Sequence, residues 1–443
     1  MTSIAQITEM LEQILEVEAE QLAKDVGFIQ RERAFSGADF AQTLILGWLQ
    51  QPEVTLDGLT QILQRREVTI TAAGLTQRFT PQAAAFLEGL LERLSQVRLQ
   101  AEAVDIALLK RFSAVVVEDS SLVTLPHELA TSWSGCGGSA GASPAAVKLF
   151  VRWDVLAGSL QGPRLSDGRH SDKRSPFLAE EVPEGGLYLA DLGFFGVERL
   201  SRLAQPATGQ KRYFVSRLQT GPALFTRAGH RIELRGILPA QVGQALEMGV
   251  LLGKQQRLPV RLLMVRVPED VAEQRRQRIR EAAQDQGREP SQEVLYVAQW
   301  TLLVTNVPAR RLSIEEALVL CRLRWQIERL FRLWKEYGRI DEWRSKNPWR
   351  ILCELYGKLA AMLIQHSLIQ AGCWSDPHRS LVKAAQVVSR EAGRIMVALY
   401  EGRLEQVVCS IVRSMRSGCR LNRRKGAPST SQLLLDGLDW RLT

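Results

Sequence analysis

One long helix is the feature of this sequence that most constrains its fold. The stretch 313–334 contains no Gly or Pro, and Ser313 with Glu316 three residues later forms a capping box that marks where the helix begins. Four chemically distinct side chains follow along it: Cys321, Arg324, Glu328 and Lys335. Because an α-helix turns about 100° per residue, these four positions fall within roughly 60° of one face.

A single acid flanked by cations on one helix face has two interpretations. In the first, Glu328 holds a metal ion while Arg324 and Lys335 hold phosphate oxygens on either side of it. In the second, the face is solvated and Arg324 forms an ordinary ion pair with Glu328 one turn later. The spacing alone leaves both interpretations open.

The net charge favours one kind of partner, and the cysteine spacing argues against two classes of fold. The 443-residue chain carries a formal charge of +9 at pH 7, which favours a polyanionic partner. Its six cysteines are scattered with no CxxC pair, which argues against a zinc ribbon and a disulfide scaffold. No apolar run reaches about 18 residues, and no signal peptide is visible at the start. We therefore expect a cytoplasmic protein with reduced thiols and no membrane span.

The N-terminal hundred residues read as helices. Between residues 55 and 94, three short helices are expected to begin after Thr55, Thr71 and Thr80, the last with Pro81 in its first turn. Basic side chains accompany them: Arg65, Arg66 and Arg78. This pattern suits a helix-turn-helix DNA reader and equally suits a plain helical bundle.

Two acids follow apolar segments that are predicted to be strands. The run 112–117 ends before Glu118 and Asp119, and the run 187–190 ends before Asp191. A strand of a packed sheet fixes a carboxylate at the edge of a site, so Asp119 and Asp191 are candidate metal ligands; the alternative for each is a polar turn residue. Residues 146–156 predict another strand, whereas 160–164 predict a turn because Gly162 and Pro163 lie inside it.

The segment between Asp191 and Glu328 is too long to be a structureless connection. It contains five stretches that are predicted to be extended: 212–218, 223–227, 232–237, 260–267 and 294–305. A charged helix is predicted between them, over 270–286. We interpret 200–299 as a mainly β insertion.

Basic residues dominate the last third of the chain. Lys and Arg outnumber Asp and Glu between residues 310 and 350, as a DNA-facing surface requires. A new helix is predicted after Asn347 and Pro348. Near the C-terminus a run without acids contains Arg420, Arg423, Arg424 and Lys425. That run is either a phosphate-binding patch or a disordered basic tail.

Three blocks in this order resemble the DDE transposases of insertion sequences that carry a Tyr-Arg-Glu-Lys signature, the insertion-sequence-four family. The signature Y-x2-R-x3-E-x6-K reads Cys321, Arg324, Glu328 and Lys335 here. The segments EDSSLVTLP at Asp119 and ADLGFF at Asp191 resemble the blocks around the first two acids, and WTLLVTNVP resembles the strand before the last helix. The resemblance covers about residues 114–372, and it makes the solvated-face interpretation of the helix untenable.

The resemblance implies an α/β fold with a ribonuclease H-like catalytic core, interrupted by a β-rich insertion, between helical N-terminal and C-terminal domains. The implied ranges are 1–100 for a DNA-binding domain, 101–199 and 300–372 for the catalytic domain, 200–299 for the insertion, and 373–443 for a basic helical region. Asp119, Asp191 and Glu328 would be the catalytic residues and would hold two Mg²⁺ ions, for which Mn²⁺ is expected to substitute.

The implied partner is double-stranded DNA, both the terminal inverted repeats of a transposon and its target, bound by a homodimer in a synaptic complex in the prokaryotic nucleoid. Implied activities are end cleavage and strand transfer by a cut-and-paste route, with hairpin ends as an option. The expected DNA contacts on and near the helix are Arg322, Arg324, Arg332, Lys335, Cys321 and Trp300. Trp300 would stack on a flipped base, or else it is a core aromatic.

Cys321 departs from the family pattern, because cysteine can neither stack nor donate a phenolic hydrogen bond as tyrosine does. This leaves two alternatives to an active transposase. One is a catalytically decayed or regulatory DNA-binding protein derived from a transposase. The other is a ribonuclease H-like structure-specific nuclease that does not join strands.

Overall fold

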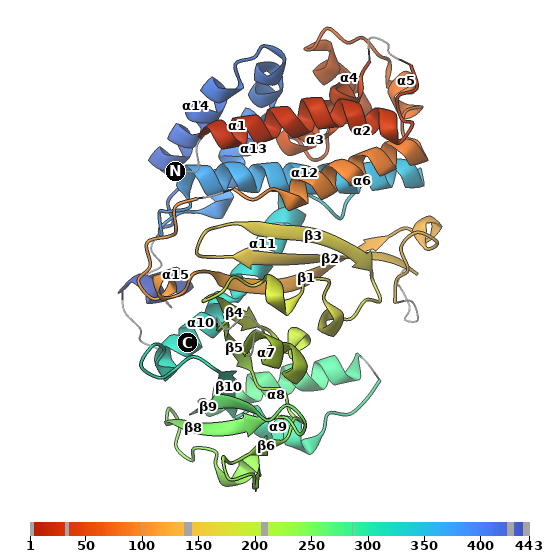
Figure 1. Cartoon of the computed structure of the whole chain (residues 1–443). Coiled ribbons are helices and arrows are strands. Elements are labelled where there is room, and N and C mark those ends of the chain that lie inside the picture. Colours follow the sequence, from red (N-terminus) through yellow and green to blue (C-terminus); the bar gives the residue numbers. More distant parts are fainter. Residues whose placement is uncertain are drawn as a thin grey trace. The chain divides into compact units, whose positions relative to one another are not determined.

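The computed structural model describes residues 4–31, 35–99, 101–136, 144–204, 211–285, 287–422 and 429–436. The chain divides into two compact units, each assembled from segments that are distant in sequence. The first unit comprises Met1–Asp105, Ser120–His170 and Ile327–Arg423; the second comprises Ile106–Asp119, Ser171–Gln326 and Arg424–Thr443. Figure 1 shows the elements of both, coloured along the sequence.

The first unit is a helical bundle with a pair of strands. Its helices are α1 (Ile4–Glu12), α2 (Ala19–Asp25), α3 (Gly37–Gln50), α4 (Leu56–Gln64), α5 (Ala72–Thr76), α6 (Pro81–Gln96), most of α11 (Trp325–Glu336), α12 (Pro348–Cys373), α13 (Leu381–Tyr400) and α14 (Leu404–Gly418). The 26-residue helix α12 is buried along nearly its whole length and packs against α3, α6, α13 and α14 (Figure 1). The N-terminal and C-terminal helices therefore share one core within this unit.

Side-chain caps begin the short N-terminal helices where the sequence predicts them. Thr55, Thr71 and Thr80 each accept a hydrogen bond from a backbone N–H three residues later. The helix that Thr80 begins, α6, lies along α12 and buries its apolar face there. The segment expected to be either a helix-turn-helix or a plain helical bundle thus packs into the bundle of the first unit. The four domain ranges expected from the sequence stay a prediction.

In the part of the chain that the structure describes, the strands form a mixed sheet of ten, with hydrogen-bonded order β3-β2-β1-β4-β5-β10-β9-β8-β6-β7. Their bounds are β1 (Val115–Leu125), β2 (Ala145–Asp154), β3 (Leu160–Asp167), β4 (Leu187–Ala190), β5 (Tyr213–Arg217), β6 (Leu224–Phe225), β7 (Arg231–Ile232), β8 (Ala245–Leu252), β9 (Leu258–Arg266) and β10 (Trp300–Thr305). β1, β4 and β5 pair in parallel, whereas β10, β9 and β8 pair antiparallel. The expected α/β class, with further strands inserted in the sequence between β5 and β10, is confirmed. The ribonuclease H type of its core stays a prediction.

Two sequence predictions about strands are wrong. The predicted turn at 160–164 is instead part of β3, an edge strand, where the missing N–H of Pro163 costs no ladder hydrogen bond. The strand predicted to end at Val117 instead continues as β1 to Leu125, because the alternating residues Val123 and Leu125 are buried.

The insertion also differs in detail from the prediction. β5 lies inside the range 200–299, yet it pairs in parallel with β4 as part of the core. Part of the predicted extended stretch 294–305 is the helix α9 (Gln292–Val297), and the strand β8 was not predicted. The charged helix is confirmed as α8 (Glu269–Gln284).

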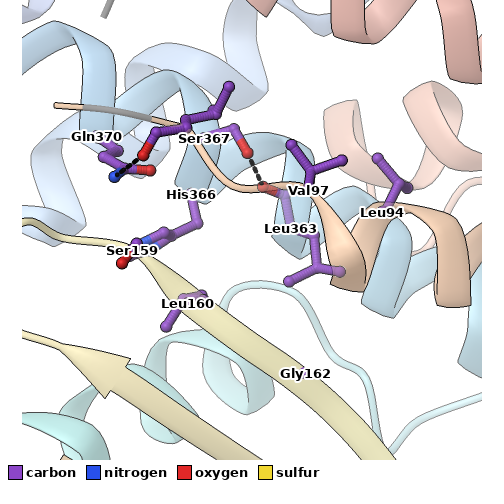
Figure 2. A pocket seen from close by; sticks show the side chains of 10 residues that line it. Leu94, Val97, Ser159, Leu160, Gly162, Leu363, His366, Ser367 and Gln370 are labelled. Carbon is purple, nitrogen blue, oxygen red and sulfur yellow. Dashed lines mark hydrogen bonds between the residues drawn. The ribbon is translucent and has the colours of Figure 1, made fainter. Parts of the chain in front are cut away.

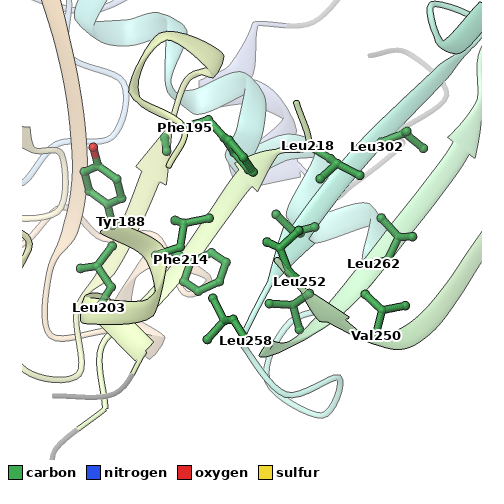
Figure 3. Close-up of a cluster of buried hydrophobic side chains, with 14 of the residues drawn as sticks. Tyr188, Phe195, Leu203, Phe214, Leu218, Val250, Leu252, Leu258, Leu262 and Leu302 are labelled. Atoms are coloured by element: carbon green, nitrogen blue, oxygen red, sulfur yellow. The ribbon is translucent and has the colours of Figure 1, made fainter. Parts of the chain in front are cut away.

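Apolar side chains from both ends of the second unit's sheet meet in one cluster. Figure 3 shows it, with residues from β4, β5, β8, β9 and β10 and from helix α7 (Val197–Ala204). Phe214, Leu252, Leu262 and Val304 are fully buried within it, as burial of a large apolar area requires. The insertion strands are therefore packed into the same core as the strands that carry the acids.

The long predicted helix forms as two consecutive helices, α10 (Ile314–Leu323) and α11 (Trp325–Glu336). The predicted capping box is confirmed, since Ser313 and Glu316 each accept a hydrogen bond from the other's backbone N–H. Arg324 lies at the junction with helical backbone angles, φ −49° and ψ −34°. A further helix, α15 (Thr430–Asp436), contacts α10. Among the residues that the structure describes, no helix is long and apolar enough to cross a membrane.

Candidate active site

Asp119 and Asp191 lie at the point where the parallel pairing of β1 with β4 ends. The register pairs Val115 with Leu187 and Val117 with Leu189. Side chains alternate between the two faces of a strand, so extending this register by two residues brings Asp119 beside Asp191 on the face of those buried residues. In α/β sheets this carboxyl edge of parallel strands is where ligands bind.

The guanidinium of Arg324 lies between the two carboxylates. Its Nη1 is 3.7 Å from Oδ2 of Asp119, and its Nε is 3.5 Å from Oδ1 of Asp191. All three side chains are partly exposed: 14% for Arg324, 19% for Asp119 and 33% for Asp191. These distances exceed those of charge-assisted hydrogen bonds, so each of these two contacts is a longer-range ion pair.

Two further arginines of the second unit, Arg217 and Arg275, lie near Cys321. Arg217, the last residue of β5, lies near the thiol of Cys321, where its charge favours the thiolate. Burial raises the pKa of Cys321, although Arg217 and Arg324 oppose the rise. Arg275 on α8 donates to the carbonyl of Trp300 (3.1 Å) and to Oγ1 of Thr301 (3.0 Å). Burial and the charge of Arg217 lower the pKa of Arg275 to about 10.

The opposite face of β1 carries a buried ion pair. Glu118 is fully buried and accepts two hydrogen bonds from Nη2 of Arg199 on α7, at 2.8 and 3.0 Å. The Arg199 guanidinium also lies 5.3 Å from the ring centroid of Tyr188 on β4. This pair ties α7 to the strand directly beneath Asp119.

The third expected ligand and the last cation of the signature belong to the first unit. Glu328 lies in the first turn of α11 and is partly buried. Lys335, in the last turn of the same helix, donates a hydrogen bond to the carbonyl of Leu122 on β1 at 2.9 Å. Among the described residues, no three His, Cys, Asp or Glu side chains are grouped so as to hold a metal ion.

The donor set of the second unit nevertheless fits a divalent cation. Two carboxylates from neighbouring strands converge on a single positive charge, that of Arg324, which stands in for a cation there. Carboxylate oxygens are the ligands that Mg²⁺ and Mn²⁺ prefer. Asp119 and Asp191 are therefore suited to hold such an ion.

The comparison with known families is decisive. Residues 110–364, more than half of the chain, match the model of the transposase DDE domain. The chain belongs to the DDE transposase family. The matched range contains Asp119, Asp191, Glu328 and Lys335.

Curated relatives of this DDE domain protein are transposases of bacterial insertion sequences. The transposase for element IS231F of Bacillus thuringiensis subsp. israelensis is 28% identical over 369 residues, covering 78% of this chain and 76% of that protein. The transposase for IS1151 of Clostridium perfringens is 24% identical over 376 residues, covering 80% and 78%. A solved piggyBac transposase synaptic complex with hairpin DNA is similar at a TM-score of 0.46 and 10% identity, covering 97% of this chain and 88% of that chain.

Trp300 lies in the core of the second unit. It is 6% exposed, its indole N–H donates to the carbonyl of Pro239 at 2.9 Å, and its ring lies 5.0 Å from that of Tyr296. This is the placement of a core aromatic, the alternative that the sequence left open.

Two expected DNA contacts near the helix junction differ in exposure. Arg322 is partly buried, whereas Arg332 is exposed and pairs with Glu336 at 3.6 Å. Their contacts with DNA remain predictions.

The other expected DNA contacts have varied surroundings. Arg66 is 10% exposed and pairs with Asp39 at 3.0 Å, so its charge is compensated inside the bundle. Arg78 lies 5.3 Å from the ring centroid of Phe35, and Arg65 is exposed. Arg420 is exposed and pairs with Asp376 at 3.4 Å. The remaining predicted contacts lie outside the described residues: Arg423, Arg424 and Lys425.

Sequence reasoning missed four residues around the acids: Glu118, Arg199, Arg217 and Arg275. The positions of two of them, Glu118 and Arg217, could have been inferred from the sequence. Glu118 directly precedes Asp119, so strand alternation alone sends it to the opposite face. Arg217 occurs near the end of a predicted strand. Arg199 and Arg275 meet their partners only through tertiary packing, which no local pattern reports.

A small pocket in the first unit is lined by no Asp, Glu, Lys or Arg among the described residues. Figure 2 shows its lining, which comes from the end of α6, from β3 and from α12. His366 is its titratable group; Nε2 lies 2.6 Å from the carbonyl of Gly158. Burial lowers the pKa of His366 to about 4, so its ring is neutral at physiological pH. The pocket belongs to the packing of α12.

Proposed function

We propose that this chain is a DNA transposase that cleaves DNA at the ends of an insertion sequence and joins the freed ends to target DNA. The observation that carries the proposal is the meeting of Asp119 and Asp191 around one cation, in a chain of the DDE transposase family. Glu328 is proposed as the third acid, since it follows Arg324 by four residues in the family's signature spacing.

The proposed role of the three acids is to hold two divalent cations. When bound, such ions supply an activated oxygen nucleophile and stabilise the leaving oxygen of a phosphodiester. Asp119 and Asp191 are fixed by the sheet register, so they need little reorganisation to hold a cation. Their partial exposure gives a substrate access to them.

The proposed role of the cations is to grip the DNA backbone. Arg324 offers a planar fork of donors to phosphate oxygens. Lys335 has three ammonium donors, one of which Leu122 takes. Arg217 adds positive charge beside Cys321, where the family signature has tyrosine. This local excess of charge supports anion binding despite the cysteine.

The finer steps belong to the same proposal. A free 3′-hydroxyl at a cleaved end can serve as the next nucleophile, which gives a cut-and-paste route and permits a hairpin at the end. Two ends must be brought together for transposition, so we propose that two copies act in one DNA complex. The mass of that complex in solution tests the stoichiometry, and denaturing gels of cleaved ends test for a hairpin.

The test of function is cleavage of a labelled linear duplex that carries the terminal repeat flanking the gene, with a scrambled repeat as control. We expect Mg²⁺-dependent cleavage at the end junction, which Glu328→Ala abolishes while specific binding in a gel-shift assay persists. Specific binding without cleavage in Mg²⁺ or Mn²⁺ would instead support a regulatory protein. Cleavage of both duplexes alike would support a nuclease without end recognition.

A further inference from the structure

Arg324 occupies the position between two carboxylates where a divalent cation would have to bind. Its guanidinium lies 3.7 Å from Asp119 and 3.5 Å from Asp191. Two like charges on neighbouring strands repel each other unless a cation neutralises them. Arg324 supplies positive charge between these two acids.

A guanidinium and a divalent ion cannot occupy this space together. Both are cations, and at a separation of a few ångströms in a partly buried site they repel each other strongly. Arg217 and Arg275 lie in the same neighbourhood and add further positive charge. A metal ion that binds the two acids must therefore displace the Arg324 side chain.

The surroundings of Arg324 allow such a displacement. The residue lies at the junction of α10 and α11, and its side chain is long and 14% exposed. Its contacts with Asp119 and Asp191 are longer than the 2.8 Å bond that holds Glu118 to Arg199 on the other face of β1. Ion pairs of this length can be exchanged at lower cost than short, hydrogen-bonded ones.

We propose that Arg324 is a built-in competitor of the catalytic metal ion, and that metal binding transfers its guanidinium from the two aspartates to a phosphodiester. This inference rests on the proposed function, because it takes Asp119 and Asp191 as metal ligands. The two events are then coupled: metal binding exposes a phosphate-binding group, and phosphate binding vacates the metal site. By linkage the coupling is reciprocal. The free protein is held in a form with low metal affinity until DNA arrives.

The test is a titration of the full chain with Mn²⁺, followed by electron paramagnetic resonance, in the absence of DNA. Removing the competing charge in Arg324→Gln is expected to tighten Mn²⁺ binding about tenfold, within the usual range of coupling between two sites. Arg324→Lys, which keeps a positive charge, should bind Mn²⁺ much more weakly than Arg324→Gln. An unchanged or weaker affinity in Arg324→Gln would overturn the inference.

A matched control removes a comparable arginine elsewhere in the same unit. Arg276 on α8 also pairs with two carboxylates, Glu269 at 2.7 Å and Glu273 at 2.8 Å. Arg276→Gln should leave the Mn²⁺ affinity as in the wild type. If both arginine variants gain affinity equally, the effect is one of net charge and the inference fails. Arg324→Met serves as a second neutral variant if Arg324→Gln does not fold.

Failure of the inference can be told apart from failure of the proposed function. Asp119→Asn should lose Mn²⁺ binding, since a carboxamide lacks the charge of the ligand. If Asp119→Asn and the wild type bind Mn²⁺ alike, the proposed metal site is wrong. If Asp119→Asn loses binding but Arg324→Gln gains none, the metal site stands and only the competition is refuted.

Discussion

Two neighbouring acids on β1, Glu118 and Asp119, have opposite environments. Glu118 is fully buried and held by two short hydrogen bonds from Arg199. Asp119, one residue later, is 19% exposed and lies 3.7 Å from the cation it shares with Asp191. Strand alternation points the two side chains to opposite faces of β1, and a ligand can reach Asp119 but not the fully buried Glu118.

Glu118 is therefore placed to stabilise the fold, whereas Asp119 is placed to bind a ligand. Removing one partner of a buried, fully bonded ion pair leaves an uncompensated charge in the core, so Glu118 and Arg199 depend on each other for stability. A partly exposed acid with a distant cation can take a new partner at little cost. We expect substitution of Glu118 to reduce stability and substitution of the partly exposed acids to reduce catalysis.

The largest expected effect is on catalysis. Asp191→Asn should slow single-turnover cleavage of a DNA end by about 10³-fold or more, equivalent to roughly 4 kcal/mol of transition-state stabilisation. The carboxamide keeps the shape of the side chain but not the charge that a divalent cation requires. Thermal unfolding serves as the control, since the melting temperature should stay close to that of the wild type. Wild-type cleavage by this variant would refute the assignment.

The buried pair should show its effect in stability. Glu118→Ala is expected to lower the free energy of unfolding by about 3–5 kcal/mol, because Arg199 is left without its counter-charge. Urea unfolding of the full chain measures this. The double variant Glu118→Ala/Arg199→Met, which removes both charges, should recover part of the loss. A loss below about 1 kcal/mol in the single variant would place Glu118 with ordinary surface acids.

In the first unit, His366 is another buried ionisable side chain whose effect should appear in stability. Its pKa in the folded protein, about 4, lies below the ordinary value of 6.5, so the unfolded chain binds the extra proton more readily. Its contribution to stability is complete above pH 6.5 and is lost as the pH falls toward 4, by about 3 kcal/mol in total. Unfolding measured across this window should show the loss, and His366→Gln should flatten it. An equal slope in both proteins would contradict the assignment to His366.

The smallest expected effect concerns the thiol of Cys321. It lies near Arg217 and Arg324, yet it is shielded from solvent. Because burial raises the pKa of its thiol, iodoacetamide at neutral pH should label it several-fold more slowly than the exposed Cys136. Arg217→Gln should slow the labelling further, since Arg217 lowers the pKa of that thiol. Mass spectrometry of the two peptides gives both rates. Equal rates for Cys321 and Cys136 would show that the thiol is not shielded.

Much of this arrangement could be predicted from local patterns. The capping box at Ser313, the caps at Thr55, Thr71 and Thr80, and the charged helix of the insertion are short-range features, and each formed as expected. Asp119 and Asp191 could be singled out because each follows an apolar, β-branched or aromatic run.

The rest depends on tertiary contacts. A proline inside a segment argues for a turn unless the strand lies at an edge, and nothing local identifies β3 as an edge strand. The partner of Glu118 comes from a helix 81 residues later, and the packing of α6 on α12 joins distant parts of the chain. Loop-closing contacts of this kind leave no periodic signal in the sequence.

The most direct test of the account compares the two faces of β1 in one cleavage assay. Asp119→Asn and Glu118→Gln would be incubated with Mg²⁺ and a labelled DNA end, at a temperature where circular dichroism shows both folded. The account predicts that Asp119→Asn binds the end without cleaving it, whereas Glu118→Gln cleaves within about tenfold of the wild-type rate, a difference of roughly 1.4 kcal/mol. Wild-type cleavage by Asp119→Asn, or equal loss of cleavage in both folded variants, would contradict it.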